Sequence, residues 1–256
     1  MDETVTWGLV ALLAPLILVV AGAYASVGLG GGTGYLAIMA LAGVAPAVMA
    51  PTALLLNILV TGVALLRFGV AGHLRWRLLL PFLVPAVPAA FAGGLVRADP
   101  RVFLGVLAGA LALAALAMLR SAPGADERED LPPRARLYGV AVPAGLVIGL
   151  ISGFLGVGGG VFLGPLVLLL GWAGPKQVAA MNSCLILVVS AVALAAHGLR
   201  GGLELQVVLP LGVAAVVGGL LGATLTEKVS APQLQRIFAV LVVLAALKAG
   251  WDAWAS

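Results

Sequence analysis

A glycine-rich stretch occurs twice in this chain, and each copy interrupts a long apolar run. The first copy is Gly28-Leu-Gly-Gly-Gly-Thr-Gly-Tyr35 and the second is Gly156-Val-Gly-Gly-Gly-Val-Phe-Leu163. Consecutive glycines favour unwound backbone, because glycine adopts conformations that other residues avoid. In lipid, unwound backbone is tolerated only where it is buried in protein or lines a polar cavity. The two copies therefore predict two broken helices in the protein interior.

The composition places the apolar runs in a membrane. Of the 256 residues, 62% are hydrophobic and 9% are charged, whereas soluble domains carry about 25% charged residues. Several runs of 17 or more apolar residues are long enough to cross a hydrocarbon core roughly 30 Å thick. The net charge of +4 comes from basic residues between these runs, which indicates membrane topology rather than nucleic-acid binding. We therefore expect an all-α polytopic membrane protein.

Ten apolar segments are expected to be helices. They cover residues 7–26, 33–44, 47–66, 78–96, 102–119, 137–155, 161–171, 177–196, 206–224 and 233–250. The strongly polar stretch between the fifth and sixth segments reads as a linker. We expect a first transmembrane repeat at 1–119, a polar linker at 120–136 and a second repeat at 137–256. The acidic residues Asp2 and Glu3 argue against a cleaved signal peptide, whose first residues are basic.

The two halves align with an offset of about 130 residues, which indicates an internal duplication. The aligned pairs are Gly28 with Gly156, Thr52 with Asn182, Pro81 with Pro210, and Phe103 with Phe238.

The short segments 33–44 and 161–171 decide how the repeats are oriented. They are shorter than the roughly 20 residues of an untilted span. If they cross, each repeat has five spans and the repeats are inverted; if they are re-entrant, each has four and the repeats are parallel. Loop basic residues divide ten to four between the two sides in the first arrangement and nine to five in the second. Because basic residues gather on the cytoplasmic side, we expect ten spans, inverted repeats, and both termini outside.

The glycine pair predicts an anion site. The helices that begin after the breaks, near Thr33 and Val161, would point free N–H groups and partial positive charge at the breaks. Close helix packing is the competing interpretation, and the two equivalent copies favour the functional one. A nucleotide loop is excluded because no Lys-Ser/Thr follows. The candidate backbone donors are Gly30, Gly31, Gly32, Thr33, Gly158, Gly159 and Gly160.

Polar side chains follow each glycine stretch and could complete the coordination of an oxyanion. Taken singly, each also fits an interhelical hydrogen bond, worth under about 1 kcal/mol. Asn57 and Ser190 alone fit that second interpretation, and Cys184 fits simple packing, with a thiol role as the alternative. The matching positions of Thr52 and Asn182-Ser183 favour function. The candidate set is Thr52, Asn57, Asn182, Ser183 and Cys184.

Other chemistry is limited by what the apolar segments lack. No carboxylate falls within them, so the proton relay common in transporters is not available. His73 and His197 are far apart in sequence and make no metal constellation. His73 is expected at the membrane interface, and His197 either at a helix end or as a gate. With one cysteine, a dithiol mechanism is excluded. We expect no metal, no cofactor, no nucleic-acid partner and no enzymatic activity.

The two glycine motifs and the polar patches after them resemble the TauE/SafE family of membrane permeases, over nearly the whole chain. The resemblance implies a bacterial or archaeal inner-membrane carrier for sulfite, sulfonates or related small organosulfur anions. The chain departs from the family pattern after the first glycine copy, where a proline is missing, while the second copy keeps Pro165. The expected small-Thr-Ser patches appear as Pro51-Thr52-Ala53 and Asn182-Ser183-Cys184.

We therefore predict a permease that exports a small sulfur-containing anion, such as sulfite or an organosulfonate, by alternating access of the two repeats. An inside-negative potential would drive an anion outward with about 2.3 kcal/mol per charge per 100 mV. Two alternatives stay open: a small-anion channel, and a carrier for a different small anion. The expected partners are the anion and the lipid bilayer, and the chain could be a monomer or a homodimer.

Overall fold

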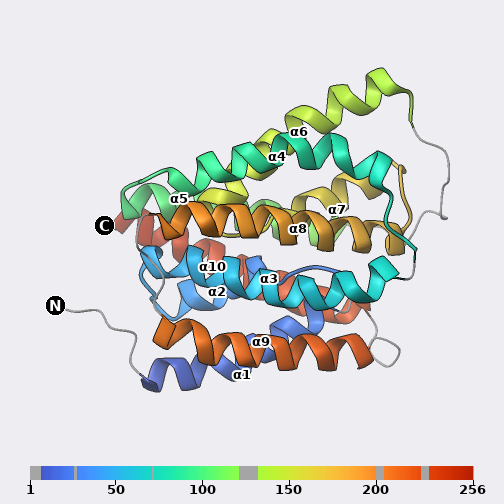
Figure 1. Cartoon of the computed structure of the whole chain (residues 1–256). Coiled ribbons are helices and arrows are strands. Elements are labelled where there is room, and N and C mark those ends of the chain that lie inside the picture. Colours follow the sequence, from blue (N-terminus) through green and yellow to red (C-terminus); the bar gives the residue numbers. More distant parts are fainter. Residues whose placement is uncertain are drawn as a thin grey trace.

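The computed structural model describes residues 7–25, 28–70, 72–120, 132–199, 205–225 and 231–255, and these form helices and the turns between them (Figure 1). This confirms the predicted all-α class. The acidic start of the chain and the centre of the predicted linker lie outside the described residues. The helices are α1 (Trp7–Ala25), α2 (Gly32–Leu41), α3 (Pro46–Val70), α4 (Trp76–Leu95), α5 (Pro100–Arg120), α6 (Arg134–Leu155), α7 (Gly160–Leu169), α8 (Pro175–Gly198), α9 (Leu205–Leu225) and α10 (Ala231–Ala255).

Each predicted apolar segment corresponds to one helix, and the ends differ by a few residues. The two short helices end earlier than predicted, because a glycine follows each of them in the left-handed conformation. Gly43 has φ +73 after α2, and Gly171 has φ +63 after α7. In both copies this glycine and the next residue donate hydrogen bonds back into the last turn of the helix, so α2 and α7 stop at equivalent points.

The repeats are inverted with respect to each other. Figure 1 shows the N- and C-termini at the same end of the bundle, whereas α6 begins at the opposite end. The short helices α2 and α7 have 10 residues each, about 15 Å at 1.5 Å per residue. Each returns the chain to the end at which the preceding long helix began (Figure 1). Each repeat therefore leaves the membrane on the side opposite to its entry, as the ten-span arrangement predicts.

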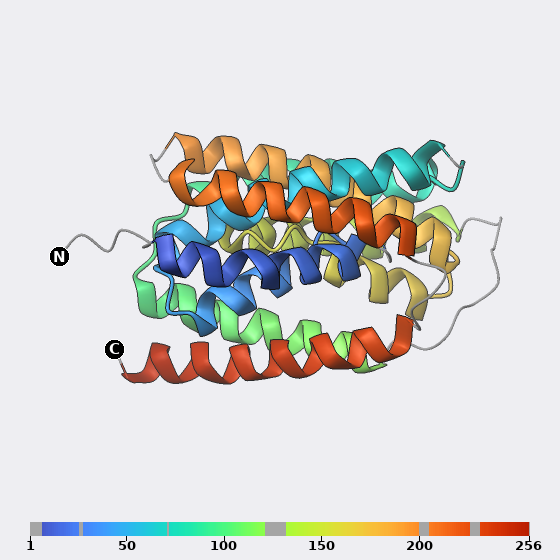
Figure 2. The same cartoon turned by 90° about the horizontal axis from the view of Figure 1, so that it is seen from below.

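Helices of one repeat pack mainly against helices of the other. The helix α1 packs on α9, and its counterpart α6 packs on α4. The counterparts α5 and α10 pack side by side along one edge (Figure 2). At the centre, α3 packs on α8. The two repeats are thus interlocked rather than separate bundles.

Glycines allow the closest of these contacts. On α6, Gly145, Gly149 and Gly153 lie against the backbone carbonyls of α4, so that a Cβ at any of them would overlap a carbonyl oxygen. The same contact recurs between α9 and α1, where Gly222 lies against the backbone of Gly22. Small residues at four-residue spacing let membrane helices approach in this way.

The helices α3 and α8 form the interior of the bundle. In each, 67% of the apolar window is buried, compared with 39% in α1 and in α6. Five of the described helices, α1, α3, α4, α6 and α8, are long and apolar enough to cross a membrane. The outer helices expose leucine, valine and tryptophan side chains, as a surface facing lipid tails requires. Polar side chains in the middle of α3 and α8 are therefore enclosed in protein; these are Thr52, Asn57, Thr61, Asn182, Ser183 and Ser190.

Basic residues gather at the end of the bundle where α5 ends and α6 begins, which we call the linker end. By the positive-inside rule this end is predicted to face the cytoplasm, with both termini outside. Among the described residues, the linker end carries Arg75, Arg77, Arg134, Arg136 and Lys176, and the other end Arg97, Arg101 and Lys248.

Candidate substrate-binding site

The two glycine stretches form the turns from α1 into α2 and from α6 into α7. Several of their glycines have φ values that side chains disfavour, including +90 at Gly31 and +83 at Gly159. These two residues are the N-caps of α2 and α7, and no described side chain caps either helix. Because the first N–H groups of a helix lack intrahelical partners, both helices begin with donors and partial positive charge available to a ligand.

The first backbone hydrogen bond of each short helix shows which N–H groups ahead of it are left as donors. In α2 the first bond runs from the N–H of Tyr35 to the carbonyl of Gly31, at 2.9 Å. In α7 it runs from the N–H of Phe162 to the carbonyl of Gly159, at 3.0 Å. The N–H groups ahead of each bond, beginning at the helix start, point into the break. An anion is the natural partner for such a group of donors.

The two breaks touch each other. A Cβ added at Gly32 would overlap the carbonyl oxygen of Val157 in the second break and would lie 2.7 Å from Nδ2 of Asn57. A Cβ at Gly158 would likewise lie 2.8 Å from the same Nδ2. The amide of Asn57 on α3 therefore lies between the start of α2 and the second break. We refer to this point as the crossing.

Ile186 on α8 takes the place opposite Asn57. Counted from the prolines that open α3 and α8, these two residues occupy the same position. Both contact Gly30 and Gly158: a Cβ at Gly30 would lie 2.7 Å from Oδ1 of Asn57 and 3.0 Å from Cγ2 of Ile186. The crossing is therefore symmetric in shape, and it has one amide side and one aliphatic side.

Each break is held by a side chain of the other repeat. The Nδ2 of Asn57 donates to the carbonyl of Gly156 at 3.1 Å, and the Oγ of Ser183 lies 3.1 Å from the carbonyl of Gly28. The two carbonyls belong to the aligned first glycines of the two stretches. Ser183 also lies 2.9 Å from the carbonyl of Ala179 in its own helix. The prediction of interhelical bonding for Asn57 is thus met through its Nδ2, while its Oδ1 has no partner among the described residues.

Unpaired polar atoms are numerous in the membrane interior. An unsatisfied buried polar group costs about 1–3 kcal/mol, so such groups usually mark bound water or a ligand. All six of the side chains concerned are at most 3% exposed. Among the described residues the atoms are Tyr35 Oη, Thr52 Oγ1, Asn57 Oδ1, Ser152 Oγ, Asn182 Oδ1 and Ser190 Oγ.

The predicted side-chain ligands are not all at the crossing. Asn182 lies further along α7, where a Cβ at Gly164 would be 2.8 Å from its Nδ2. The Oγ1 of Thr33 points to α1 and lies 3.3 Å from the Oη of Tyr24. Thr52 is fully buried without a partner among the described residues, and Cys184 is packed in an apolar cluster.

The predicted glycines divide in a similar way. Gly30, Gly32 and Gly158 contact the crossing directly. Gly160 lies against Ile186 and, at 3.4 Å from an added Cβ, against Asn182. The N-cap glycines instead abut side chains of the flanking helices, Tyr35 in the first copy and Ile148 in the second.

Sequence reasoning missed three residues of this region. Ile186 carried no signal, because an apolar residue in an apolar helix is unremarkable until its partners are known. Tyr35 stood inside the quoted glycine motif but was not considered as a ligand. Ser152 lies beside the second break, and its Oγ is 2.9 Å from a Cβ added at Gly159. Its position about one helical turn before Gly156 could have indicated this.

The two histidines are placed apart from the crossing. His197 is buried near the end of α8, and its Nε2 lies 2.9 Å from the carbonyl of Gly153 near the end of α6. Carbonyls in the last turn of a helix lack intrahelical partners, so this contact joins His197 to the end of α6. His73 lies half-buried before α4, at the linker end.

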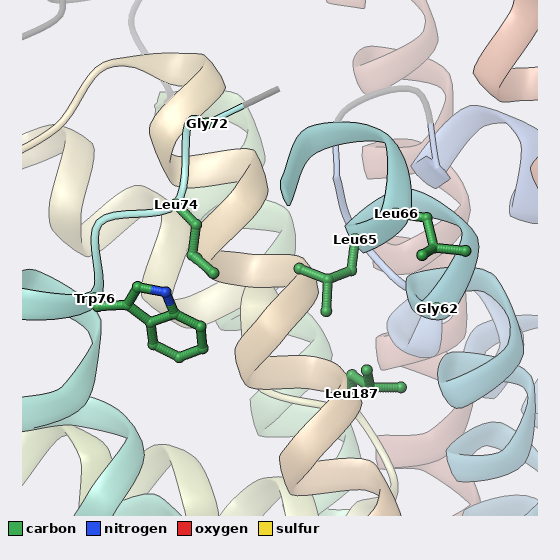
Figure 3. Close-up of a pocket in the computed structure, with 7 residues that line it drawn as sticks. All are labelled: Gly62, Leu65, Leu66, Gly72, Leu74, Trp76 and Leu187. Atoms are coloured by element: carbon green, nitrogen blue, oxygen red, sulfur yellow. The ribbon is translucent and has the colours of Figure 1, made fainter. Parts of the chain in front are cut away.

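A separate apolar groove opens between the end of α3, the start of α4 and the middle of α8 (Figure 3). Its volume is about 720 Å³ and its lining includes Leu65, Leu74, Trp76 and Leu187. Trp76 is 52% exposed. An apolar and open groove on a membrane protein suits lipid chains rather than an anion, so the crossing remains the better candidate for the substrate.

The chain matches the family described as "Sulfite exporter TauE/SafE" over residues 9–249. A protein of Sinorhizobium fredii named "Probable membrane transporter protein y4hK" is 37% identical over 241 residues, covering 93% of this chain and 97% of the relative. A "Probable membrane transporter protein" of Xylella fastidiosa is 27% identical over 197 residues, 72% of each chain. No solved structure matches the chain. These bacterial relatives confirm the expected location in a cell membrane.

Proposed function

We propose that this chain, which belongs to the sulfite exporter TauE/SafE family of membrane transporters, exports a small sulfur-containing anion, either sulfite or an organosulfonate. Membership of the family makes it a membrane transporter, and the substrate and direction are our proposal. One observation carries it: two helices without side-chain caps begin at a buried crossing where the amide of Asn57 lies between the breaks.

The donors around the crossing suit an anion with several oxygens. Backbone N–H groups of the two glycine stretches would bind the oxygens, and the amide of Asn57 would add a side-chain donor. Thr52 and Asn182 would contact the anion as it moves along the short helices. In this proposal Ser183 positions the first break, because its hydroxyl is already bonded to Gly28.

No negatively charged side chain among the described residues is placed at the crossing. The only carboxylates among the described residues are Asp99 and Asp252, both near helix ends, and Asp252 pairs with Lys248 at 2.6 Å. A bound anion would therefore meet helix N-termini and neutral polar groups, without a charged carboxylate beside it. Neither carboxylate is placed at the crossing to take up a proton for coupling, so we propose the membrane potential and the anion gradient as the driving force.

Inverted repeats supply a route to alternating access. In such folds the substrate site lies at the repeat interface, and the two repeats exchange conformations to open one side or the other. The repeats proposed at 1–119 and 137–256 interlock through α3 and α8. The linker proposed at 120–136 would act as a tether. Movement of one set of helices against the other would expose the crossing to each side in turn.

Purified protein and proteoliposomes test this function. Sulfite, thiosulfate, methanesulfonate and taurine are each added to detergent-purified protein, with chloride, nitrate and acetate as matched anions. We expect the sulfur oxyanions to raise the unfolding temperature and the matched anions to have little effect. In proteoliposomes, an inside-negative potential should accelerate anion efflux.

Three results would contradict the proposal. If no anion raises the unfolding temperature at millimolar concentration, the proposed anion site is contradicted. Flux that neither saturates nor shows counterflow would indicate the channel alternative. Stabilisation and transport confined to a non-sulfur anion would indicate a carrier of a different specificity.

A further inference from the structure

The phenol of Tyr35 lies over the start of its own helix. A Cβ added at Gly31, the N-cap of α2, would lie 2.7 Å from both Cζ and Oη of Tyr35. Helical side chains lean toward the N-terminus, so a residue one turn into a helix can cover the cap. The Tyr35 hydroxyl is thereby brought to the end of α2 where the uncapped N–H groups lie.

This hydroxyl is enclosed and unpaired. Tyr35 is 0% exposed, and its Oη has no hydrogen-bond partner among the described residues. The two nearby hydroxyls of Tyr24 and Thr33 instead lie 3.3 Å from each other. A buried hydroxyl without a hydrogen-bond partner destabilises the fold, so its presence at the start of α2 indicates a bound ligand or a water molecule.

Packing alone does not require the phenolic oxygen. The equivalent residue in the second repeat, found by aligning Gly31 with Gly159, is Leu163. Leu163 is also 0% exposed and belongs to an apolar cluster. Likewise Thr33 is replaced by Val161. The start of α7 is therefore packed with aliphatic side chains at these two positions, whereas the start of α2 carries two hydroxyl groups there.

We propose that Tyr35 is a substrate-binding residue, whose neutral phenol donates a hydrogen bond to an oxygen of the bound oxyanion at the start of α2. This inference rests on the proposed function, because it needs an anion bound at the start of α2, next to the crossing. It adds a side-chain donor beside the backbone N–H groups at the start of α2.

The test compares the three tyrosines of the chain as phenylalanine variants. Tyr35→Phe removes the unpaired hydroxyl, Tyr24→Phe removes a paired one, and Tyr138→Phe removes an exposed one at the linker end. For each, the unfolding temperature is measured without anion, and the Kd for sulfite and for methanesulfonate is measured by calorimetry in detergent.

For Tyr35→Phe we expect unchanged or higher stability without anion, because a buried unsatisfied group is lost. We expect its Kd for both anions to rise about tenfold or more, as for loss of a hydrogen bond to a charged group. Tyr138→Phe should match the wild type in both measurements, and Tyr24→Phe should be less stable without anion.

Wild-type affinity in Tyr35→Phe would overturn this inference while leaving the proposed function in place. Loss of stability without anion, together with unchanged affinity, would assign the hydroxyl a structural role and would also overturn it. Absence of anion binding by the wild type would contradict the proposed function and this inference together.

Discussion

The side-chain amide of Asn57 donates a hydrogen bond to the carbonyl of Gly156, 3.1 Å away in the other repeat. Ser183 makes the reciprocal contact with Gly28. Each unwound stretch is thus anchored to the central helix of the opposite repeat. Because these contacts join the parts that would move in the proposed alternating access, a shift of one repeat against the other would change the geometry of both breaks.

Replacement of Gly31 by alanine is predicted to destabilise the protein by about 2 kcal/mol or more. Alanine at φ +90 is strained, and its Cβ would clash with the Tyr35 ring. Gly43→Ala is the matched control, because Gly43 also has a positive φ but no atom within 4 Å of an added Cβ. Its loss should be about 1–2 kcal/mol. Denaturant unfolding in detergent measures both, and equal losses would contradict the role of Tyr35 in covering the cap.

Close packing of α6 on α4 is predicted to depend on Gly153. A Cβ at this position would overlap the carbonyl oxygen of Ala90, so Gly153→Ala should cost about 1–3 kcal/mol. Gly139→Ala lies on the same helix with no atom within 4 Å and should cause no loss. The unfolding temperatures of the two variants compare them directly. A Gly153→Ala variant as stable as Gly139→Ala would show that the helices are further apart than described.

The inverted topology predicts that α1 and α6 begin on opposite sides of the membrane. The single cysteine, Cys184, is buried, and Cys184→Ala provides a background for introduced cysteines. Trp7→Cys at the start of α1 should react with a membrane-impermeant thiol reagent applied outside intact cells. Arg134→Cys at the start of α6 should react only after permeabilisation. Labelling of both from the same side would indicate parallel repeats.

The helices and the breaks could be predicted from the sequence because their causes are local. Apolar runs set the helices, consecutive glycines set the breaks, and the uneven distribution of basic residues indicated the inversion. The ends of α2 and α7 were placed too late, since the turns at Gly43 and Gly171 were not considered as helix stops.

The arrangement of the site depends on tertiary packing that no local pattern encodes. The sequence alignment paired Thr52 with Asn182, whereas the opening prolines of α3 and α8 pair Asn182 with Ala53. One residue of helical register rotates a side chain by about 100°, given 3.6 residues per turn. In the pairing set by the prolines, Asn57 matches Ile186 and both lie at the crossing, whereas Asn182 lies beside α7. The inward turn of Tyr35 and the bond of Ser183 to Gly28 arise only once the repeats interlock.

The most direct test of the anion site is the affinity of sulfite for Asn57→Leu, measured by calorimetry on detergent-purified protein. The substitution keeps a side chain of similar size and removes the amide at the crossing. Ile186→Val is the matched control on the aliphatic side and should bind sulfite within about twofold of the wild type, with a stability loss of about 0.5–1.5 kcal/mol. We predict that Asn57→Leu binds sulfite at least about tenfold more weakly. Binding by Asn57→Leu as tight as that of the wild type would contradict the assignment of the crossing as the substrate site.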